Sequence, residues 1–179
     1  SIEAFLVANA RMQCVRGRAS FAAGRSANDA ESIRRPMNKP QPTPREAYAH
    51  FTQITTRWMD NDAYAHVNNV VYYSWFDTVV NEYLVRAGVL EIAHSDVVGL
   101  VVETQCNYFA PIAFPDRVTA GLRVAKLGTS SVRYEIGIFR NDEPQAAAQG
   151  HFVHVACDRH THRPVPMPAE LRRALEALR

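Results

Sequence analysis

The residues with the clearest chemical potential lie in one short segment between residues 58 and 72. It contains two carboxylates, a histidine and two adjacent asparagines, namely Asp60, Asp62, His66, Asn68 and Asn69. A carboxylate can attack a carbonyl carbon or activate a water for that attack. The start of a helix offers unpaired backbone N–H groups and a partial positive charge for the carbonyl oxygen. Because acyl transfer needs both parts, this segment indicates acyl-transfer chemistry.

A helix must follow this segment if the backbone N–H groups are to be available. Apolar residues recur there with helical spacing, at Tyr72, Trp75, Phe76, Val79, Val80, Tyr83 and Leu84. This spacing predicts a helix of about four turns with one broad apolar face. Asn68 or Asn69 is the expected N-cap, and Gly88 the expected stop.

Strand patterns surround this helix. His50–Arg57 precedes it, and four strand-like segments follow, at Val97–Phe109, Arg117–Leu127, residues 132–138 and Ala146–Cys157. A short helix is expected over Ala169–Leu178. A helix with so wide an apolar stripe must be covered, and the strands are what remains to cover it. We therefore predict an α+β hotdog fold for residues 47–179, in which an antiparallel sheet wraps around one long central helix. His151 and His154 should face opposite sides of the last strand.

Residues 1–46 differ in composition from the rest of the chain. Arginine, alanine and serine dominate the first part, and Pro36, Pro40, Pro42 and Pro44 then punctuate a connector. This N-terminal extension could be an organelle transit peptide, a disordered tail, or an over-extended gene start with Met37 as the true initiator. We favour the last interpretation and expect the extension to be poorly ordered or outside the native core.

Composition narrows the function classes. The formal net charge of +2 is too small to indicate a nucleic-acid partner. No apolar run approaches the roughly 20 residues of a membrane-spanning helix, so no membrane partner is expected. The three cysteines, Cys14, Cys106 and Cys157, are widely spaced and form no zinc-binding pattern. Reduced thiols in a cytoplasmic protein are the expected state.

In these motifs the sequence resembles the 4-hydroxybenzoyl-CoA thioesterase family of hotdog enzymes, in its bacterial acyl-CoA thioester hydrolase branch. The resemblance covers residues 50–158. It rests on Asp60-Asn61-Asp62, His66-Val67-Asn68-Asn69, Tyr72, Gly88, Asn107–Pro111 with Asp116, and Leu127–Ser131.

The resemblance implies roles for individual residues. Asp62 matches the catalytic carboxylate, and the backbone N–H of Asn69 matches the donor that polarises the thioester carbonyl. The turn formed by Gly128, Thr129, Ser130 and Ser131 matches a region that holds the nucleotide end of coenzyme A. That turn is basic in the best-known family member, whereas here it is small and polar, so only Arg123, Lys126 and Arg133 are nearby candidates for phosphate contacts. The resemblance also implies a homodimer or homotetramer, active sites at the subunit interface, and no cofactor or metal.

Several residues have a structural alternative. Asp62 could be an ordinary turn aspartate, and Asp60 is expected to order the loop rather than react. We place His66 in the site as a residue that orients substrate, although it could serve as a base. Tyr72, with Trp75 and Phe76, is expected in the core and in the wall of the acyl pocket. A metal site formed by Asp60, Asp62 and His66 is conceivable, but nothing else in the sequence completes it.

We therefore expect an acyl-CoA thioesterase that releases a free carboxylic acid and coenzyme A. Two alternatives remain: a non-catalytic module that binds acyl-CoA or acyl carrier, and an enoyl-thioester hydratase. The sequence leaves open the acyl chain and whether Asp62 acts as nucleophile or general base.

Overall fold

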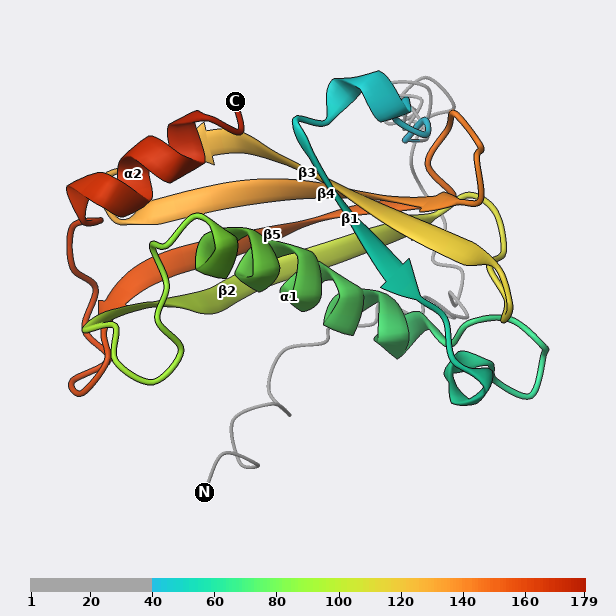
Figure 1. The fold of residues 1–179 in the computed structure, drawn as a ribbon, viewed down its shortest axis with the longest axis horizontal. Coiled ribbons are helices and arrows are strands. Elements are labelled where there is room, and N and C mark those ends of the chain that lie inside the picture. The colour runs from blue at the N-terminus through green and yellow to red at the C-terminus, as the bar shows by residue number, and fades with distance from the viewer. Residues whose placement is uncertain (1–39) are drawn as a thin grey trace, which may run out of the picture. The chain divides into compact units, whose positions relative to one another are not determined.

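The computed structural model describes residues 40–179, which form a five-stranded antiparallel sheet curved around a long helix (Figure 1). The elements follow in the order β1 (His50–Thr55), α1 (Asn69–Arg86), β2 (Val97–Tyr108), β3 (Arg117–Leu127), β4 (Ser131–Arg140), β5 (Ala148–Asp158) and α2 (Ala169–Glu176), with short 3-10 turns at Arg45–Ala47 and Trp58–Asp60. The strand order across the sheet is β1-β3-β4-β5-β2. The predicted hotdog fold is confirmed.

Helix α1 has the start and the end that its sequence predicts. The side chain of Asn68 caps it by accepting the N–H of Val70 at 3.1 Å. Gly88 lies just past the last turn with a φ of 69°, a left-handed conformation that glycine adopts without steric cost. The buried face consists of the predicted apolar positions Tyr72, Trp75, Phe76, Val79, Val80 and Leu84. Burial of this stripe against the sheet is the main source of the helix's stability.

One face of the sheet supplies the other half of the core. Alternate residues of β3 and β4 are buried against α1, at Val118, Ala120, Leu122 and Val124, and at Val132, Tyr134, Ile136 and Ile138. On β5, Phe152 packs edge-on against Phe76 of α1, whereas His151 contacts Glu103 on the opposite face. His154 lies on the same side as Phe152. The two histidines therefore face opposite sides, as predicted.

Helix α2 covers the sheet at the end where β3 meets β4. Leu175 and Leu178 are buried there, and the Tyr83 hydroxyl of α1 donates to the Ala174 carbonyl at 2.6 Å. This contact links the two helices across the concave side of the sheet.

No helix within residues 40–179 is long and apolar enough to cross a membrane.

The residues just before β1 contact the sheet. Ala146 donates its N–H to the Thr43 carbonyl at 3.1 Å, and Thr43 donates to the side chain of Gln149 at 2.7 Å. The guanidinium of Arg45 lies 4.5 Å from the ring centre of Phe139. Residues 43–46, which composition grouped with the N-terminal extension, thus pack on the domain. Residues 1–39 of that predicted extension lie outside the described residues.

Candidate active site

An ion pair between the buried Asp60 and the exposed Arg57 fixes the loop that leads from β1 to α1. Asp60 is 1% exposed, and its carboxylate accepts three hydrogen bonds from Arg57, one from the backbone N–H and two from the guanidinium, at 2.7–3.0 Å. The pairing raises the pKa of Arg57, through the hydrogen bond and charge of Asp60. The carbonyl of Asp60 accepts the N–H of Asn68 at 2.8 Å. Asp60 is therefore a loop-ordering residue, as its sequence context predicts.

The loop is also tied to the segment between β2 and β3. Val67 donates its N–H to the Ile112 carbonyl at 2.7 Å, and the Asn61 side chain accepts the N–H of Phe114 at 3.0 Å. These bonds join segments more than forty residues apart in sequence and tie the loop to the connection between β2 and β3.

Asp62 opens a tight turn within this loop. Its N–H donates to the His66 carbonyl at 2.8 Å, and Ala65 occupies the left-handed region with a φ of 62°. One carboxylate oxygen, Oδ1, accepts the N–H of Tyr64 at 2.8 Å. The second oxygen, Oδ2, accepts no hydrogen bond from residues 40–179. Asp62 is thus oriented through one oxygen while the other stays available for chemistry.

The start of α1 presents an unused hydrogen-bond donor. The N–H of Val70 is capped by the Asn68 side chain, and the N–H of Val71 donates to the Asn68 carbonyl at 3.0 Å. Within the described chain, the N–H of Asn69 makes no such bond. This donor lies at the positive end of an 18-residue helix. It is suited to a carbonyl oxygen on which negative charge develops.

These groups line one pocket of about 390 Å³. Asp62, His66, Asn69 and Tyr72 contribute from the loop and α1, and the far wall is formed by Tyr108, Phe109, Ala110 and Pro111. The structure therefore brings together four of the eight predicted site residues. His66 is exposed at the rim, whereas Tyr72 is 3% exposed.

Two tyrosines that line the pocket contact each other. The rings of Tyr72 and Tyr108 meet edge to face with centres 5.0 Å apart, and the Tyr108 hydroxyl donates to the Asn69 carbonyl at 3.3 Å. Burial raises the pKa of Tyr72 to about 12 and also raises that of Tyr108. Both phenols therefore stay protonated near neutral pH. Tyr108 was not among the predicted site residues, although it lies within the Asn107–Pro111 run on which the resemblance partly rested.

The other four predicted site residues, Gly128–Ser131, lie at the opposite end of the sheet within the protomer (Figure 1). β3 begins beside the loop, where the Thr56 hydroxyl donates to the Asp116 carbonyl at 2.8 Å, and runs away from it to Leu127. The carbonyls of the turn accept hydrogen bonds from Arg172, Met167 and Ala156. A single protomer thus does not join this turn to Asp62.

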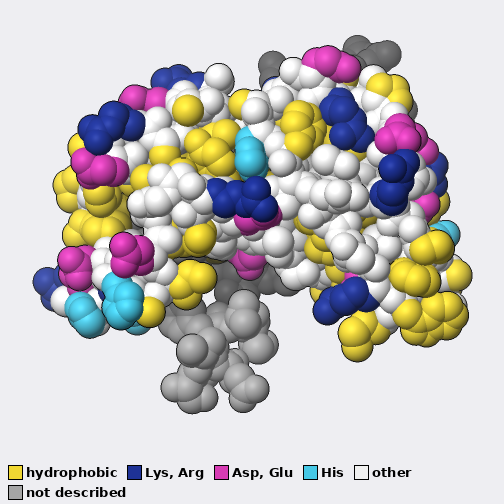
Figure 2. Space-filling model, in the orientation of Figure 1, with side chains coloured by type: hydrophobic (Ala, Val, Ile, Leu, Met, Phe, Trp, Pro, Cys, Tyr) yellow, Lys and Arg dark blue, Asp and Glu magenta, His cyan; other side chains and the backbone are white. Residues whose placement is uncertain are grey.

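Exposed apolar side chains rim the Asp62 loop. Trp58, Met59 and Tyr64 are 81%, 74% and 83% exposed, and the ring of Trp58 lies 6.1 Å from that of Phe114. Figure 2 shows hydrophobic side chains gathered at the lower right, over the loop before α1.

No group of three or more histidine, cysteine, aspartate or glutamate side chains within residues 40–179 is arranged to hold a metal ion.

A sequence model of the thioesterase-like superfamily matches residues 56–175, which include this pocket and every strand except β1. The chain belongs to that superfamily. A thioesterase-type hydrolase is therefore the general class of this protein.

Solved structures of other proteins have the same fold. A protein from Pseudomonas aeruginosa strain PAO1 is 56% identical, with a TM-score of 0.76, over 78% of this chain and 97% of that one. A thioesterase from Thermus thermophilus, solved with coenzyme A and zinc, is 30% identical, with a TM-score of 0.63, over 74% of this chain and 95% of that one. A 1,4-dihydroxy-2-naphthoyl-CoA thioesterase from Synechocystis, 16% identical with a TM-score of 0.64 over 70% and 93% of the two chains, shares the fold.

Proposed function

We propose that this superfamily member hydrolyses the thioester of an acyl-coenzyme A, with Asp62 as the catalytic carboxylate. The observation that carries the proposal is the pairing, in one pocket, of a carboxylate with one free oxygen and the unused N–H of Asn69 at a helix start. Coenzyme A bound to the 30% identical thioesterase supports a coenzyme A thioester as substrate. Assignment to the 4-hydroxybenzoyl-CoA thioesterase family and a cytoplasmic location belong to the same proposal. The unpaired Cys106 and Cys157 are consistent with that location.

The pocket supplies the two functions that thioester hydrolysis needs. Oδ2 of Asp62 removes a proton from water as it attacks the carbonyl carbon, or attacks that carbon itself to form a mixed anhydride that water then cleaves. The N–H of Asn69 donates to the carbonyl oxygen as negative charge develops there. The C–S bond breaks, and coenzyme A leaves as a thiolate that takes up a proton. His66, at the rim, orients the substrate.

The exposed edge of β2 supports a homodimer as the active form. β2 is twelve residues long and pairs with β5 only, so its other side is an unpaired edge within the described chain. Leu100, Val101 and Val102 are 37%, 45% and 60% exposed there. A long, apolar, unpaired edge strand is a template for pairing with another strand. We propose that a second copy pairs its own β2 with this edge, antiparallel about a two-fold axis.

This pairing would also unite the two halves of the predicted site. Antiparallel pairing places the start of one β2 beside the end of the other, where the Asp62 pocket lies. The partner's β4 then runs three strand spacings away, roughly 14 Å at the usual separation. Gly128–Ser131 of the partner subunit would thus lie on the same side as Asp62, at a distance an extended coenzyme A arm can span.

A charge placed on this edge should dissociate the dimer and lower activity. The double variant Val101→Lys/Val102→Lys puts two lysines on each of two paired strands, where their repulsion and desolvation oppose association. We expect a monomer in size-exclusion chromatography with light scattering, and kcat/KM for thiol release reduced at least about ten-fold because each site loses its partner. Gln53→Lys, on the exposed edge strand β1, is the matched control and should leave the dimer intact. A monomeric wild type, or a dimer unaffected by the lysines, would contradict the proposed interface.

The proposed activity is tested with short, medium, long and aromatic acyl-CoAs. We expect release of free thiol from at least one class. Loss of the absorbance of an enoyl-CoA without thiol release would instead indicate a hydratase. Tight binding of acyl-CoA without either reaction would indicate a non-catalytic module.

A further inference from the structure

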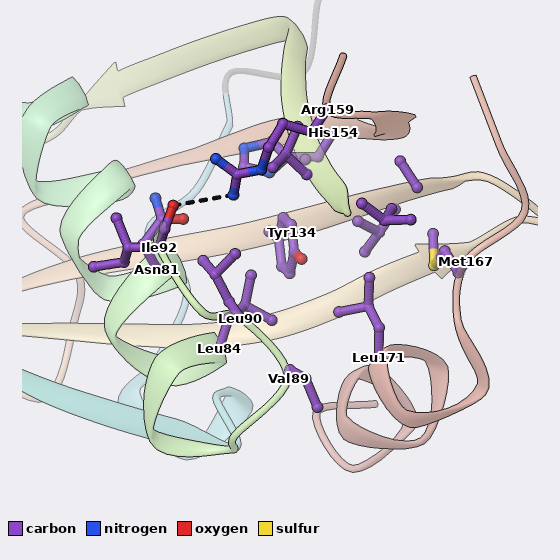
Figure 3. Close-up of a pocket in the computed structure, with 15 residues that line it drawn as sticks. Asn81, Leu84, Val89, Leu90, Ile92, Tyr134, His154, Arg159, Met167 and Leu171 are labelled. Atoms are coloured by element: carbon purple, nitrogen blue, oxygen red, sulfur yellow. Dashed lines mark hydrogen bonds between the residues drawn. The ribbon is translucent and has the colours of Figure 1, made fainter. Parts of the chain in front are cut away.

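A second cavity lies at the far end of α1 from Asp62. It has a volume of about 340 Å³ and opens between the C-terminal half of α1, the start of β2, strands β4 and β5, and α2. Figure 3 shows Leu84 and Leu90 on one side of Tyr134, with Met167 and Leu171 on the side of α2. The walls are mainly aliphatic, so the cavity suits an apolar ligand.

One polar side chain on this wall lacks a partner. His154 is 4% exposed, and its Nε2 is the single buried side-chain nitrogen or oxygen without a hydrogen bond in residues 40–179. Its ring is held by Tyr134 and Phe152, at 5.2 and 5.6 Å between ring centres. On its other side, a Cβ at Gly99 would lie 2.9 Å from Nδ1, so the ring packs directly on the backbone of β2. A buried polar atom of this kind is rare in folded proteins and calls for a partner.

The chemistry of that partner follows from the state of the imidazole. Burial lowers the pKa of His154 to about 4, so the ring is neutral near pH 7. Nε2 of a neutral imidazole is a donor in one tautomer and an acceptor in the other. A hydroxyl group both donates and accepts, so it satisfies either tautomer. An anion finds no positive charge on the ring, and the guanidinium of Arg159, which also lines the cavity, already donates to the carbonyls of Ser95 and Ile92. An anion would therefore be desolvated without a free partner.

We propose that this cavity binds an apolar group that carries an uncharged hydroxyl, and that His154 Nε2 selects the hydroxyl by a hydrogen bond. The volume is about twice the roughly 150 Å³ that holds one benzene, so a two-ring or medium-length aliphatic skeleton fits.

The position of the cavity's mouth relates the cavity to the proposed function. The assignment of the bound group to an acyl chain rests on that function. Asn81 and Gly99 line the cavity and are exposed, so it opens between α1 and the start of β2. Asn81 is twelve residues beyond Asn69, roughly 18 Å along the helix, which is far from the Asp62 pocket of the same protomer. In the proposed dimer, the end of the partner's β2 and its Asp62 loop reach this mouth. The hydroxylated group is then the distal end of an acyl chain whose thioester lies at the partner's catalytic loop.

The test compares two ligands that differ only in the hydroxyl, 2-naphthol and 2-methylnaphthalene. Binding to the full-length protein is followed by NMR of ¹⁵N-labelled histidine and does not depend on thioester hydrolysis. We expect 2-naphthol to bind about ten-fold more tightly, because only its hydroxyl satisfies Nε2, and to shift the Nε2 resonance of His154.

Variants on the two faces of β5 assign the effect to His154. His154→Phe keeps a ring but removes Nε2, and should bring the affinity ratio close to one. His154→Gln keeps a polar side-chain end and should retain the preference. His151→Phe, on the opposite face of the same strand, is the matched control and should behave as wild type. If His154→Phe does not fold, the Nε2 shift in the wild type decides.

Equal affinities for the two ligands, no binding of either, or an unmoved Nε2 resonance would overturn the proposal. Selective binding in a protein that releases no thiol would uphold the cavity's selectivity and reject the proposed hydrolysis. Where hydrolysis is present, a hydroxyacyl-CoA should exceed its deoxy analogue in kcat/KM, and His154→Phe should abolish that difference.

Discussion

Replacing Asp62 with asparagine should lower kcat for acyl-CoA hydrolysis by about a thousand-fold, with little change in the affinity for acyl-CoA. An amide can neither remove a proton from water nor form a mixed anhydride, and both routes contribute effects of that order. The amide oxygen can still accept the N–H of Tyr64, as Oδ1 does now, so the turn and the pocket should persist. The measurement is steady-state thiol release, with acyl-CoA binding followed by calorimetry.

A carboxylate outside the pocket controls for the general effect of this substitution. Asp142 is exposed in the β4–β5 turn and pairs with Arg117, so Asp142→Asn should keep wild-type kcat. An Asp62→Asn protein with near-wild-type turnover would show that Asp62 is a turn residue only. Equal loss of binding and turnover would point to a disturbed loop.

The second large effect is a loss of stability in acid that depends on His154. Its pKa is lowered from 6.5 to about 4 by burial, so the unfolded chain takes up a proton in this range while the folded protein does not. The free energy of unfolding should therefore be unaffected by His154 above pH 6.5 and fall as the pH drops toward 4. The full difference corresponds to about 3 kcal/mol, more than a hundred-fold in the folding equilibrium.

Other groups titrate in the same range, so the informative quantity is the difference between wild type and His154→Gln. Urea unfolding at fixed protein concentration, from pH 7.5 to 4, should show the wild type losing stability relative to the variant. Parallel stability profiles for the two proteins would contradict a neutral, buried His154.

The features that sequence predicted well are those encoded locally. The stripe from Tyr72 to Leu84 needs only helical periodicity, and Asn68 and Gly88 mark its ends by well-known capping preferences. Asp62 and Asn69 are seven residues apart in one loop and helix start, so their shared pocket follows from short-range geometry.

The features that sequence missed depend on contacts between distant segments. Tyr108 joins the pocket because the end of β2 passes the start of α1, which no periodicity reveals. The cavity beside His154 draws its walls from five elements, and the parity of β5 predicts only which face His154 occupies. Gly128–Ser131 illustrates the reverse case. A local motif suggested a role in the site, yet its distance from Asp62 in one protomer makes that role dependent on a second copy.

Hydrolysis of an acyl-CoA thioester with water at Asp62 is the central claim. The most direct measurement is product analysis after multiple turnovers in ¹⁸O-labelled water, by mass spectrometry and thiol titration. We predict equimolar free coenzyme A and carboxylic acid, with ¹⁸O in the acid, from the wild-type protein and almost none from Asp62→Asn. Acyl-CoA recovered intact from the wild type, or the same yield from both proteins, would contradict it.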